Sequence, residues 1–181
     1  MALFVERGYA EATVAEIADQ AGLTKRSFFN HFPDKREVLF VGAILFEASV
    51  MEQLAAAGDD LDPLDAAVGA LTRSGVELAQ YSEFAQARRE LIASSAELQE
   101  RELIKMASLA AAISEALGRR GVSARTATLT AQVAITVFTT AYSDWVDDPA
   151  ADLDTLTQRA LADLRQAVAA TAALTTARGI S

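Results

Sequence analysis

Apolar residues recur every three or four positions along most of the chain, and apolar and polar residues nowhere alternate over a sustained stretch. A spacing near 3.6 places apolar side chains on one face of an α-helix, whereas a half-buried strand needs strict alternation. The pattern therefore predicts an all-α protein of about nine helices, with a tail that frays from Thr171. The expected helices cover residues of about 1–7, 13–20, 24–31, 35–57, 62–80, 83–93, 96–119, 123–145 and 152–173.

The ends of several predicted helices carry residue types that start or stop a helix. Asp62 followed by Pro63 supplies an N-cap and a first-turn proline, a position where the missing N–H costs nothing. Gly118 and Gly121 flank an Arg-Arg pair, and both cations and glycine suit the C-terminal end of a helix. These signals support the boundaries drawn from the periodicity.

Helix length divides the chain into two parts. The predicted helices before about residue 32 are short and joined by tight turns, whereas the later ones are long and rich in alanine. The expected organisation is an N-terminal helix-turn-helix module of three helices over residues 1–45, followed by a helical bundle over residues 46–181. The long helix 35–57 would join the two.

Composition narrows the class of protein. Apolar residues make up 51% of the 181 positions, which is enough to bury a core, and the chain has no cysteine, which excludes a disulfide framework or a thiolate metal site. No window approaches the roughly 18 uninterrupted apolar residues of a spanning helix, and the N-terminus carries charges too early for a signal peptide. A cytoplasmic protein is expected.

The net charge of −9 argues against a broadly basic nucleic-acid binder, but DNA binding needs only a local basic patch. Such a patch exists in the stretch TKRSFFNHFPDK, residues 24–35. It contains three cations, Lys25, Arg26 and Lys35, and a single acidic residue, Asp34, and the next residue is Arg36. Taken alone, these cations could equally be solvated surface charges.

The residues just before this patch have the pattern of a helix-turn-helix unit. Thr13 can cap a helix whose third position is Glu16, which makes a capping box. Ala18 is small where two helices would cross, Gly22 can adopt a left-handed turn, and Thr24 can cap a second short helix. In such a unit the second helix enters the DNA major groove.

The segment ALFVERGYAEATVAEIADQAGLTKRSFFNHFPDKREVL, residues 2–39, resembles the DNA-binding domain of the TetR family of bacterial transcriptional regulators. The resemblance covers about a quarter of the chain, and its spacing is specific as a set. It implies that Thr13 and Lys35 contact DNA phosphates and that Thr24 opens the recognition helix. The DNA-binding residues implied in this way are Thr13, Thr24, Lys25, Arg26, Ser27, Phe29, Asn30, His31 and Lys35.

The three phenylalanines of this helix should divide by face. At about 100° per residue, Phe28 and Phe32 share one face and are expected in the core, while Phe29 points elsewhere and could press on a thymine methyl group or the sugar-phosphate wall. The family more often has tyrosine at position 29. His31 could contact a phosphate or simply cap the helix, and it has no second histidine or cysteine to form a metal site.

For the C-terminal part, the resemblance implies a homodimer formed through helices 123–145 and 152–173. It also implies an effector cavity among helices 62–80, 83–93, 96–119 and part of 123–145. Candidate ligand contacts are Phe84, Phe138, Tyr142 and Trp145, although aromatic residues at helical spacing are core residues first.

The leading hypothesis is a ligand-responsive transcriptional repressor that a small, mainly apolar effector releases from a palindromic operator. Because the chain begins within the expected first helix, the alternative is a helical homodimer that binds a ligand or partner but has lost tight DNA binding. An enzyme is disfavoured because the sequence has no Gly-rich phosphate loop, no Gly-x-Ser-x-Gly and no Glu-x-x-His pair. No cofactor and no metal are expected.

Overall fold

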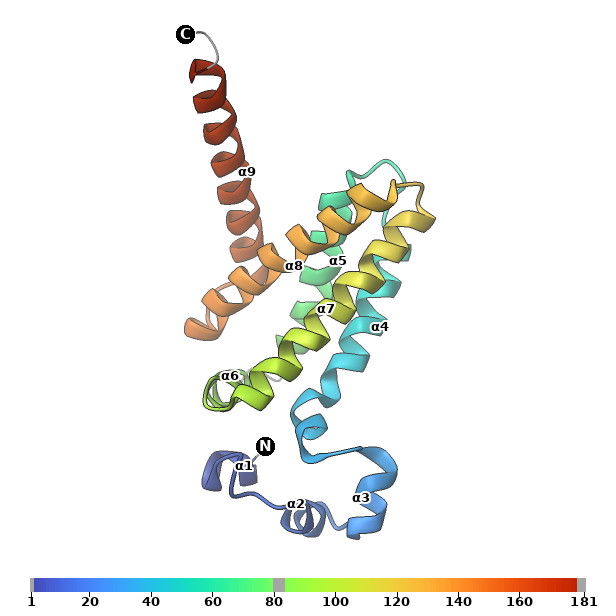
Figure 1. Cartoon of the computed structure of the whole chain (residues 1–181), viewed down its shortest axis with the longest axis vertical. Coiled ribbons are helices and arrows are strands. Elements are labelled where there is room, and N and C mark those ends of the chain that lie inside the picture. Colours follow the sequence, from blue (N-terminus) through green and yellow to red (C-terminus); the bar gives the residue numbers. More distant parts are fainter. Residues whose placement is uncertain (1, 80–83, 179–181) are drawn as a thin grey trace. The chain divides into compact units, whose positions relative to one another are not determined.

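The structure is a computed structural model that describes residues 2–79 and 84–178, of which 78, 79 and 172–178 are described for the backbone only (Figure 1). The described residues form helices and contain no strand. The helices are α1 (Ala2–Arg7), α2 (Val14–Gln20), α3 (Lys25–His31), the 3₁₀ helix η1 (Lys35–Phe40), α4 (Val41–Ala55), α5 (Pro63–Ala79), α6 (Ala85–Ala93), α7 (Ala96–Arg119), α8 (Ala124–Asp147) and α9 (Leu153–Arg178).

The all-α prediction is confirmed, and two segments differ from the expected helices. Residues 35–40 form a 3₁₀ helix rather than the start of an α-helix. Six residues are too few for a hydrophobic pattern to separate a period of 3.0 from one of 3.6. The helix α9 continues to Arg178, so the predicted fraying from Thr171 is wrong. Alanine favours the helix strongly, and no glycine or proline occurs between Thr171 and Arg178.

The chain forms two compact units. The first combines Met1–Ser49 with Tyr81–Leu109, and the second combines Val50–Gln80 with Ala110–Ser181. The first unit therefore contains the helix-turn-helix segment together with α6 and the beginning of α7. Sequence periodicity could not assign α6 to this unit, because the residues that it contacts lie about 50 or more positions away.

The core of the first unit is built from both of its chain segments. Aromatic and aliphatic side chains from α1, η1, α6 and α7 are buried together, and the loop between α1 and α2 contributes two more. These residues are Phe4, Tyr9, Ala12, Leu39, Phe40, Leu91, Ile92 and Leu98. The helix α6 thus completes a core that residues 1–45 alone would leave open.

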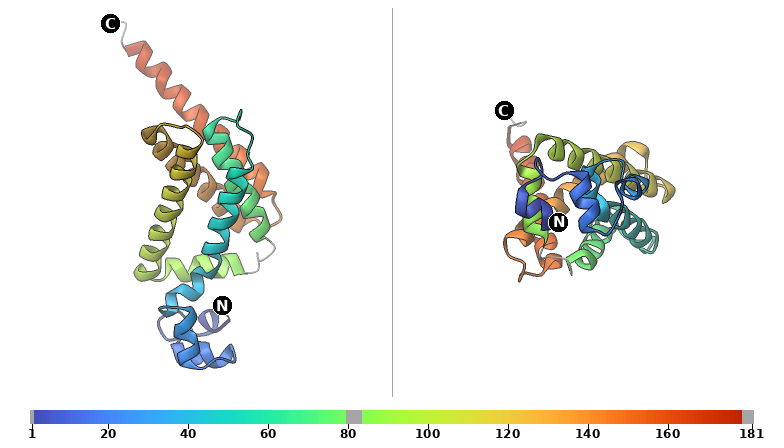
Figure 2. Two further views of the ribbon diagram at one scale, coloured as in Figure 1. Left: turned by 90° about the vertical axis from the view of Figure 1, so that its right-hand side faces the viewer. Right: turned by 90° about the horizontal axis from the view of Figure 1, so that it is seen from below.

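In the second unit, α8 packs against both α5 and α9 (Figures 1 and 2). The helices approach closely at Gly75, where a Cβ atom would lie 2.8 Å from Cε2 of Phe138 and 3.0 Å from Cδ2 of Leu153. The guanidinium of Arg120 donates to the carbonyls of Leu54 and Ala57, and so provides hydrogen-bond donors for backbone carbonyls at the C-terminal end of α4.

One segment of the described residues, Lys35–Ala55, is long and apolar enough to span a membrane by length and composition alone. The same test is met by core helices of soluble proteins. In this chain Leu39 and Phe40 of the segment belong to the core of the first unit, so packing within that unit accounts for their apolar character.

Candidate nucleic-acid interface

The first turn of α2 is fixed by the predicted capping box. The backbone N–H of Glu16 donates to Oγ1 of Thr13 at 3.3 Å, and the N–H of Thr13 donates to Oε2 of Glu16 at 2.9 Å. The Thr13 hydroxyl also donates to that oxygen at 2.8 Å, and Arg7 pairs with the other carboxylate oxygen. The hydrogen bonds from Thr13 lower the pKa of Glu16. The position of Thr13 is therefore set by several bonds at once.

The turn and the start of α3 are also closed by local hydrogen bonds. Gly22 adopts a φ of +68°, as the turn requires, and the N–H of Leu23 donates to the carbonyl of Ala18 at 2.8 Å. Thr24 then caps α3 by accepting from the N–H of Ser27 at 3.0 Å, and the two hydroxyl oxygens lie 2.9 Å apart. The helix-turn-helix unit that the sequence predicted is present in this form.

The aromatic residues of α3 divide by face. Phe28 is buried, and its ring lies 5.2 Å from that of the half-buried Phe32. Phe29 is 47% exposed, and its ring meets Phe28 edge to face, with centroids 5.5 Å apart and an interplanar angle of 89°. The buried ring thus holds an exposed one at a defined angle on the outer face of α3.

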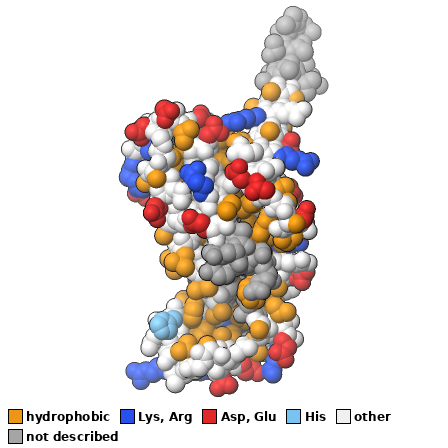
Figure 3. Space-filling model, turned by 180° about the vertical axis from the view of Figure 1, so that it is seen from behind, with side chains coloured by type: hydrophobic (Ala, Val, Ile, Leu, Met, Phe, Trp, Pro, Cys, Tyr) orange, Lys and Arg blue, Asp and Glu red, His pale blue; other side chains and the backbone are white. Residues whose placement is uncertain are grey.

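The polar residues on the outer face of α3 have no competing partner. The side chains of Lys25, Arg26, Asn30 and His31 are exposed, and none of them makes a hydrogen bond or ion pair with another described residue. Two cations, an amide and an imidazole are therefore available to an outside molecule. On the face shown in Figure 3, acidic and basic side chains are interspersed, so the net acidity does not form a single continuous patch there.

Lys35 lies in a different environment from Lys25. Its ammonium nitrogen is within 2.9 Å of the carbonyl oxygen of Tyr9 and within 3.2 Å of those of Ala10 and Ala12. The same nitrogen sits 4.4 Å from the centre of the Tyr9 ring. Lys35 therefore ties the start of η1 to the loop between α1 and α2.

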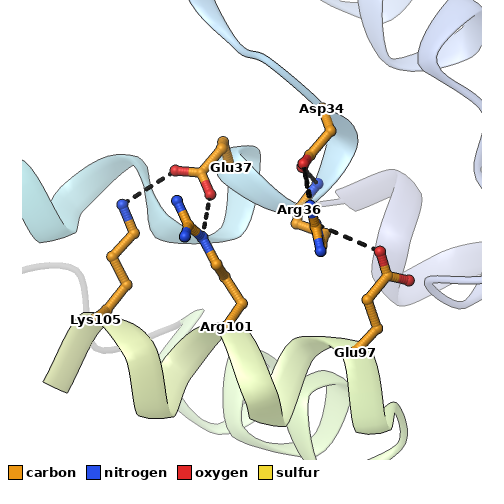
Figure 4. A network of polar contacts seen from close by, with 6 residues as sticks. All are labelled: Asp34, Arg36, Glu37, Glu97, Arg101 and Lys105. Atoms are coloured by element: carbon orange, nitrogen blue, oxygen red, sulfur yellow. Dashed lines mark hydrogen bonds and ion pairs between the residues drawn. The ribbon is translucent and has the colours of Figure 1, made fainter. Parts of the chain in front are cut away.

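An ion-pair network binds η1 to α7 within the first unit (Figure 4). Glu37 accepts from Nε of Arg101 at 2.5 Å and lies 3.1 Å from Nζ of Lys105. Burial raises the pKa of the Glu37 carboxyl, but the hydrogen bonds and charges of the two cations outweigh it, so the pKa is lowered overall. The sequence signal was the i, i+4 spacing of Arg101 and Lys105, which places both on one face of a helix.

A second part of the network surrounds Arg36, whose guanidinium pairs with Asp34 at 2.5 Å and with Glu97 at 3.4 Å (Figure 4). The hydrogen bond with Arg36 lowers the pKa of Asp34. Arg88 adds a third link, because it donates to the carbonyl of Leu39 at 3.1 Å. The contacts of Arg36 with Glu97 and of Arg88 with Leu39 join residues about 50 or more positions apart, so the local pattern could not predict them.

The four candidate ligand residues are divided between the two units. Phe138, Tyr142 and Trp145 form a row on α8, with successive ring centroids 5.9 Å and 5.5 Å apart. Phe138 and Trp145 are buried in the second unit, as core residues are. Phe84 is exposed and belongs to the first unit.

None of the four aromatic residues lines either of two hollows on the described surface. One, of about 90 Å³, lies between α4 and α7 within the first unit and is lined by apolar side chains with Glu47, Lys105 and Ser108. The other, of about 540 Å³, is an open depression where α7 turns into α8. The first is too small to enclose a typical ligand, which needs roughly 300 Å³ or more.

The outer faces of α8 and α9 combine small or hydroxyl side chains with isolated apolar ones. Leu129 on α8 is 60% exposed, and Val168 on α9 is 63% exposed. The exposed hydroxyls of Thr136 and Thr140 donate to carbonyls one turn earlier, at 3.0 and 2.9 Å, so they present their methyl groups without unsatisfied donors. These are surfaces on which another helix could pack closely.

Comparison with known proteins gives matches over both parts of the chain. The model of the bacterial regulatory proteins of the tetR family matches residues 1–41, and the model of the MftR C-terminal domain matches residues 48–169. No curated protein sequence matches the chain.

A solved structure shares the fold. The chain is similar to Thermus thermophilus FadR, a TetR family transcriptional repressor solved in complex with lauroyl-CoA. The identity is 22%, 89% of this chain and 87% of that chain are covered, and the TM-score is 0.54. It is also similar to PfmR, a TetR family transcriptional regulator from the same organism, with 21% identity, coverage of 91% and 93%, and a TM-score of 0.48.

Proposed function

The chain belongs to the tetR family of bacterial regulatory proteins, and from that premise we propose that it is a repressor released from a palindromic operator by a small, mainly apolar effector. The matching family consists of bacterial regulatory proteins rather than enzymes, and the similar FadR structure is that of a transcriptional repressor in complex with lauroyl-CoA. The observation that carries the DNA-binding part of the proposal is the outer face of α3, where the exposed polar side chains have no partner among the described residues. A regulator of this kind acts in the cytoplasm, where the DNA is.

The polar side chains at the starts of α2 and α3 and along α3 are suited to different parts of the DNA. Lys25 and Arg26 lie in the first turn of α3, where long cationic side chains can reach phosphates or guanine edges. Asn30 can form paired hydrogen bonds with adenine, and His31 can donate to a phosphate at the end of the helix. Thr13, Thr24 and Ser27 lie exposed or half-exposed at the starts of α2 and α3, where anions bind favourably.

Phe29 adds an apolar contact to this face. Its ring is held by the edge-to-face contact with Phe28, so little side-chain freedom is lost when it meets DNA. A thymine C5-methyl group is the apolar feature of the major groove that such a ring would touch. Sequence preference would then come from both hydrogen bonds and this contact.

A homodimer through α8 and α9 would place two recognition helices on one operator. The exposed Leu129 and Val168, with the hydroxyl-bearing and Ala-rich surfaces around them, support a helix-to-helix interface between two copies of the chain. Two-fold symmetry of the protein requires half-sites related by the same symmetry, spaced by one helical turn of DNA or a multiple of it.

The effector part of the proposal has the support of the family and of the apolar composition of the second unit. The FadR structure contains lauroyl-CoA, a ligand with a long apolar chain, and that structure shares the fold of this chain. The aromatic row of Phe138, Tyr142 and Trp145 is the proposed contact surface in the second unit, and Phe84 of the first unit stays a separate candidate. Binding of the effector would lower the population of the DNA-binding state.

The proposal is tested by selecting bound sequences from a pool of random DNA duplexes, with and without added cell extract. We expect a palindromic sequence to be enriched, and we expect a component of the extract to release it. An Arg26→Ala variant should lose the preference, while Arg119→Ala, which removes an exposed arginine of α7, should retain it. Failure to enrich any sequence would refute the DNA-binding assignment and favour a helical dimer that binds only a ligand or a partner.

A further inference from the structure

The ammonium group of Lys35 has no hydrogen left for an outside molecule. A lysine ammonium carries three N–H donors and no acceptor. In this structure the three carbonyl oxygens of Tyr9, Ala10 and Ala12 surround the nitrogen at 2.9, 3.2 and 3.2 Å. The ring of Tyr9 covers a further side, at 4.4 Å from its centre.

These three carbonyls depend on Lys35. They lie in the loop between α1 and α2, and no backbone N–H of the described residues donates to any of them. The loop begins at Gly8, whose φ is +81°, and its last residue before Thr13 is the fully buried Ala12. The bonds to Tyr9 and Ala12 are partly buried, whereas the bond to Ala10 is exposed. A carbonyl that is partly removed from water without a donor costs free energy, so the one cation that reaches all three stabilises this particular loop conformation.

We propose that Lys35 is a positioning residue for the DNA-binding surface and not itself a phosphate contact. By clamping the loop it fixes where Thr13 and the N-terminal end of α2 lie, since Thr13 directly follows the last clamped carbonyl. Its positive charge is shared among three carbonyl dipoles and an aromatic face. The phosphate contacts then fall to the unpartnered Lys25 and Arg26. The DNA half of this inference rests on the proposed function, whereas the clamp itself does not.

The chain offers an internal comparison because it has three lysines, Lys25, Lys35 and Lys105. The wild-type protein, free and bound to its selected operator, can be treated with limiting acetic anhydride and the modified lysines identified by mass spectrometry. We expect Lys35 to react at least about tenfold more slowly than Lys25 in the free protein, since its amine is held by three hydrogen bonds. In urea the two should react alike.

Adding DNA should protect Lys25 and leave the already slow Lys35 unchanged. If Lys35 instead reacts as fast as Lys25 in the free protein and becomes protected by DNA, the inference is overturned. Should the protein bind no DNA, Lys25 would show no protection while Lys35 stayed slow. That result would refute the proposed function and leave the clamp standing.

Salt dependence gives a second and independent readout. Each phosphate contact adds about 0.9 to the slope of log affinity against log salt, so Lys25→Met should reduce the slope by about that amount. Lys35→Met should leave the slope unchanged, weaken binding by the same factor at every salt concentration, and lower Tm by about 5 °C. A reduced slope with an unchanged Tm would show that Lys35 is a phosphate contact after all. If Lys35→Met does not fold, the acetylation experiment decides.

Discussion

Replacing Glu37 by glutamine tests the ion-pair network that binds η1 to α7. The Glu37 carboxylate is 13% exposed and faces Arg101 at 2.5 Å and Lys105 at 3.1 Å. Breaking a fully buried pair costs about 3–5 kcal/mol, whereas an exposed pair contributes about 0.2–1 kcal/mol. Because the two cations are 29% and 19% exposed, water screens part of the interaction. We therefore expect Glu37→Gln to lower the free energy of unfolding by about 2 kcal/mol.

The measurement is thermal and urea unfolding followed by far-ultraviolet circular dichroism. For a chain of this size a loss of about 2 kcal/mol corresponds to a drop in Tm of about 4–8 °C. The pKa of Glu37 is lowered from its ordinary 4.5, so its contribution is complete above that pH and disappears as the pH falls through the lower folded value. The difference between wild type and Glu37→Gln should therefore shrink below about pH 4.

The control is Glu115→Gln. Glu115 pairs with Arg119 at 2.7 Å, but its side chain is 76% exposed, so its loss should change the stability by less than about 0.5 kcal/mol. Equal effects of the two substitutions at neutral pH would refute the reasoning from burial. If the difference in the free energy of unfolding between wild type and Glu37→Gln stayed constant down to acidic pH, the reasoning from the charge of Glu37 would be refuted.

Four further substitutions follow from the structure. Gly75→Ala should lower the free energy of unfolding by about 1 kcal/mol or more, because the added Cβ would lie 2.8 Å from the ring of Phe138. The control, Gly118→Ala, meets nothing within 4 Å and should raise the free energy of unfolding by up to about 1 kcal/mol. Urea unfolding compares the two variants. Tyr9→Phe removes a buried hydroxyl without a partner and should keep or raise stability at neutral pH. Burial, followed by the charge of Glu97, raises the pKa of Tyr9 from 10.0 to about 12. The free energy of unfolding of the wild type should therefore fall by about 2–3 kcal/mol as the pH rises from about 10 to about 12, and that of Tyr9→Phe should not show this loss. Finally, replacing thymine by uracil in the selected operator removes the C5-methyl groups, which should weaken DNA binding by the wild type several-fold and binding by Phe29→Ala hardly at all. Equal losses of affinity for the two proteins in a gel-shift titration would exclude the methyl contact.

The helix-turn-helix could be predicted almost completely from the sequence, because its determinants are local. Thr13 and Glu16 lie one helical turn apart, Gly22 satisfies a turn by its own backbone freedom, and Thr24 caps the residues directly after it. The division of Phe28 from Phe29 follows from a rotation of 100° per residue. The contacts of Lys35 were not predictable in this way, since the three carbonyls that surround its ammonium lie 23 to 26 positions earlier.

The sequence by itself determined which segments are helical and which face of α3 is open, since propensity, capping and periodicity act over a few residues. Only the tertiary structure decided that α6 and the beginning of α7 complete the core of the unit that contains the helix-turn-helix. It also decided that Glu37 meets Arg101 and Lys105, more than 60 residues away. Such pairings depend on how helices pack, and the hydrophobic pattern specifies only that each has an apolar face, without naming the helix that will cover it.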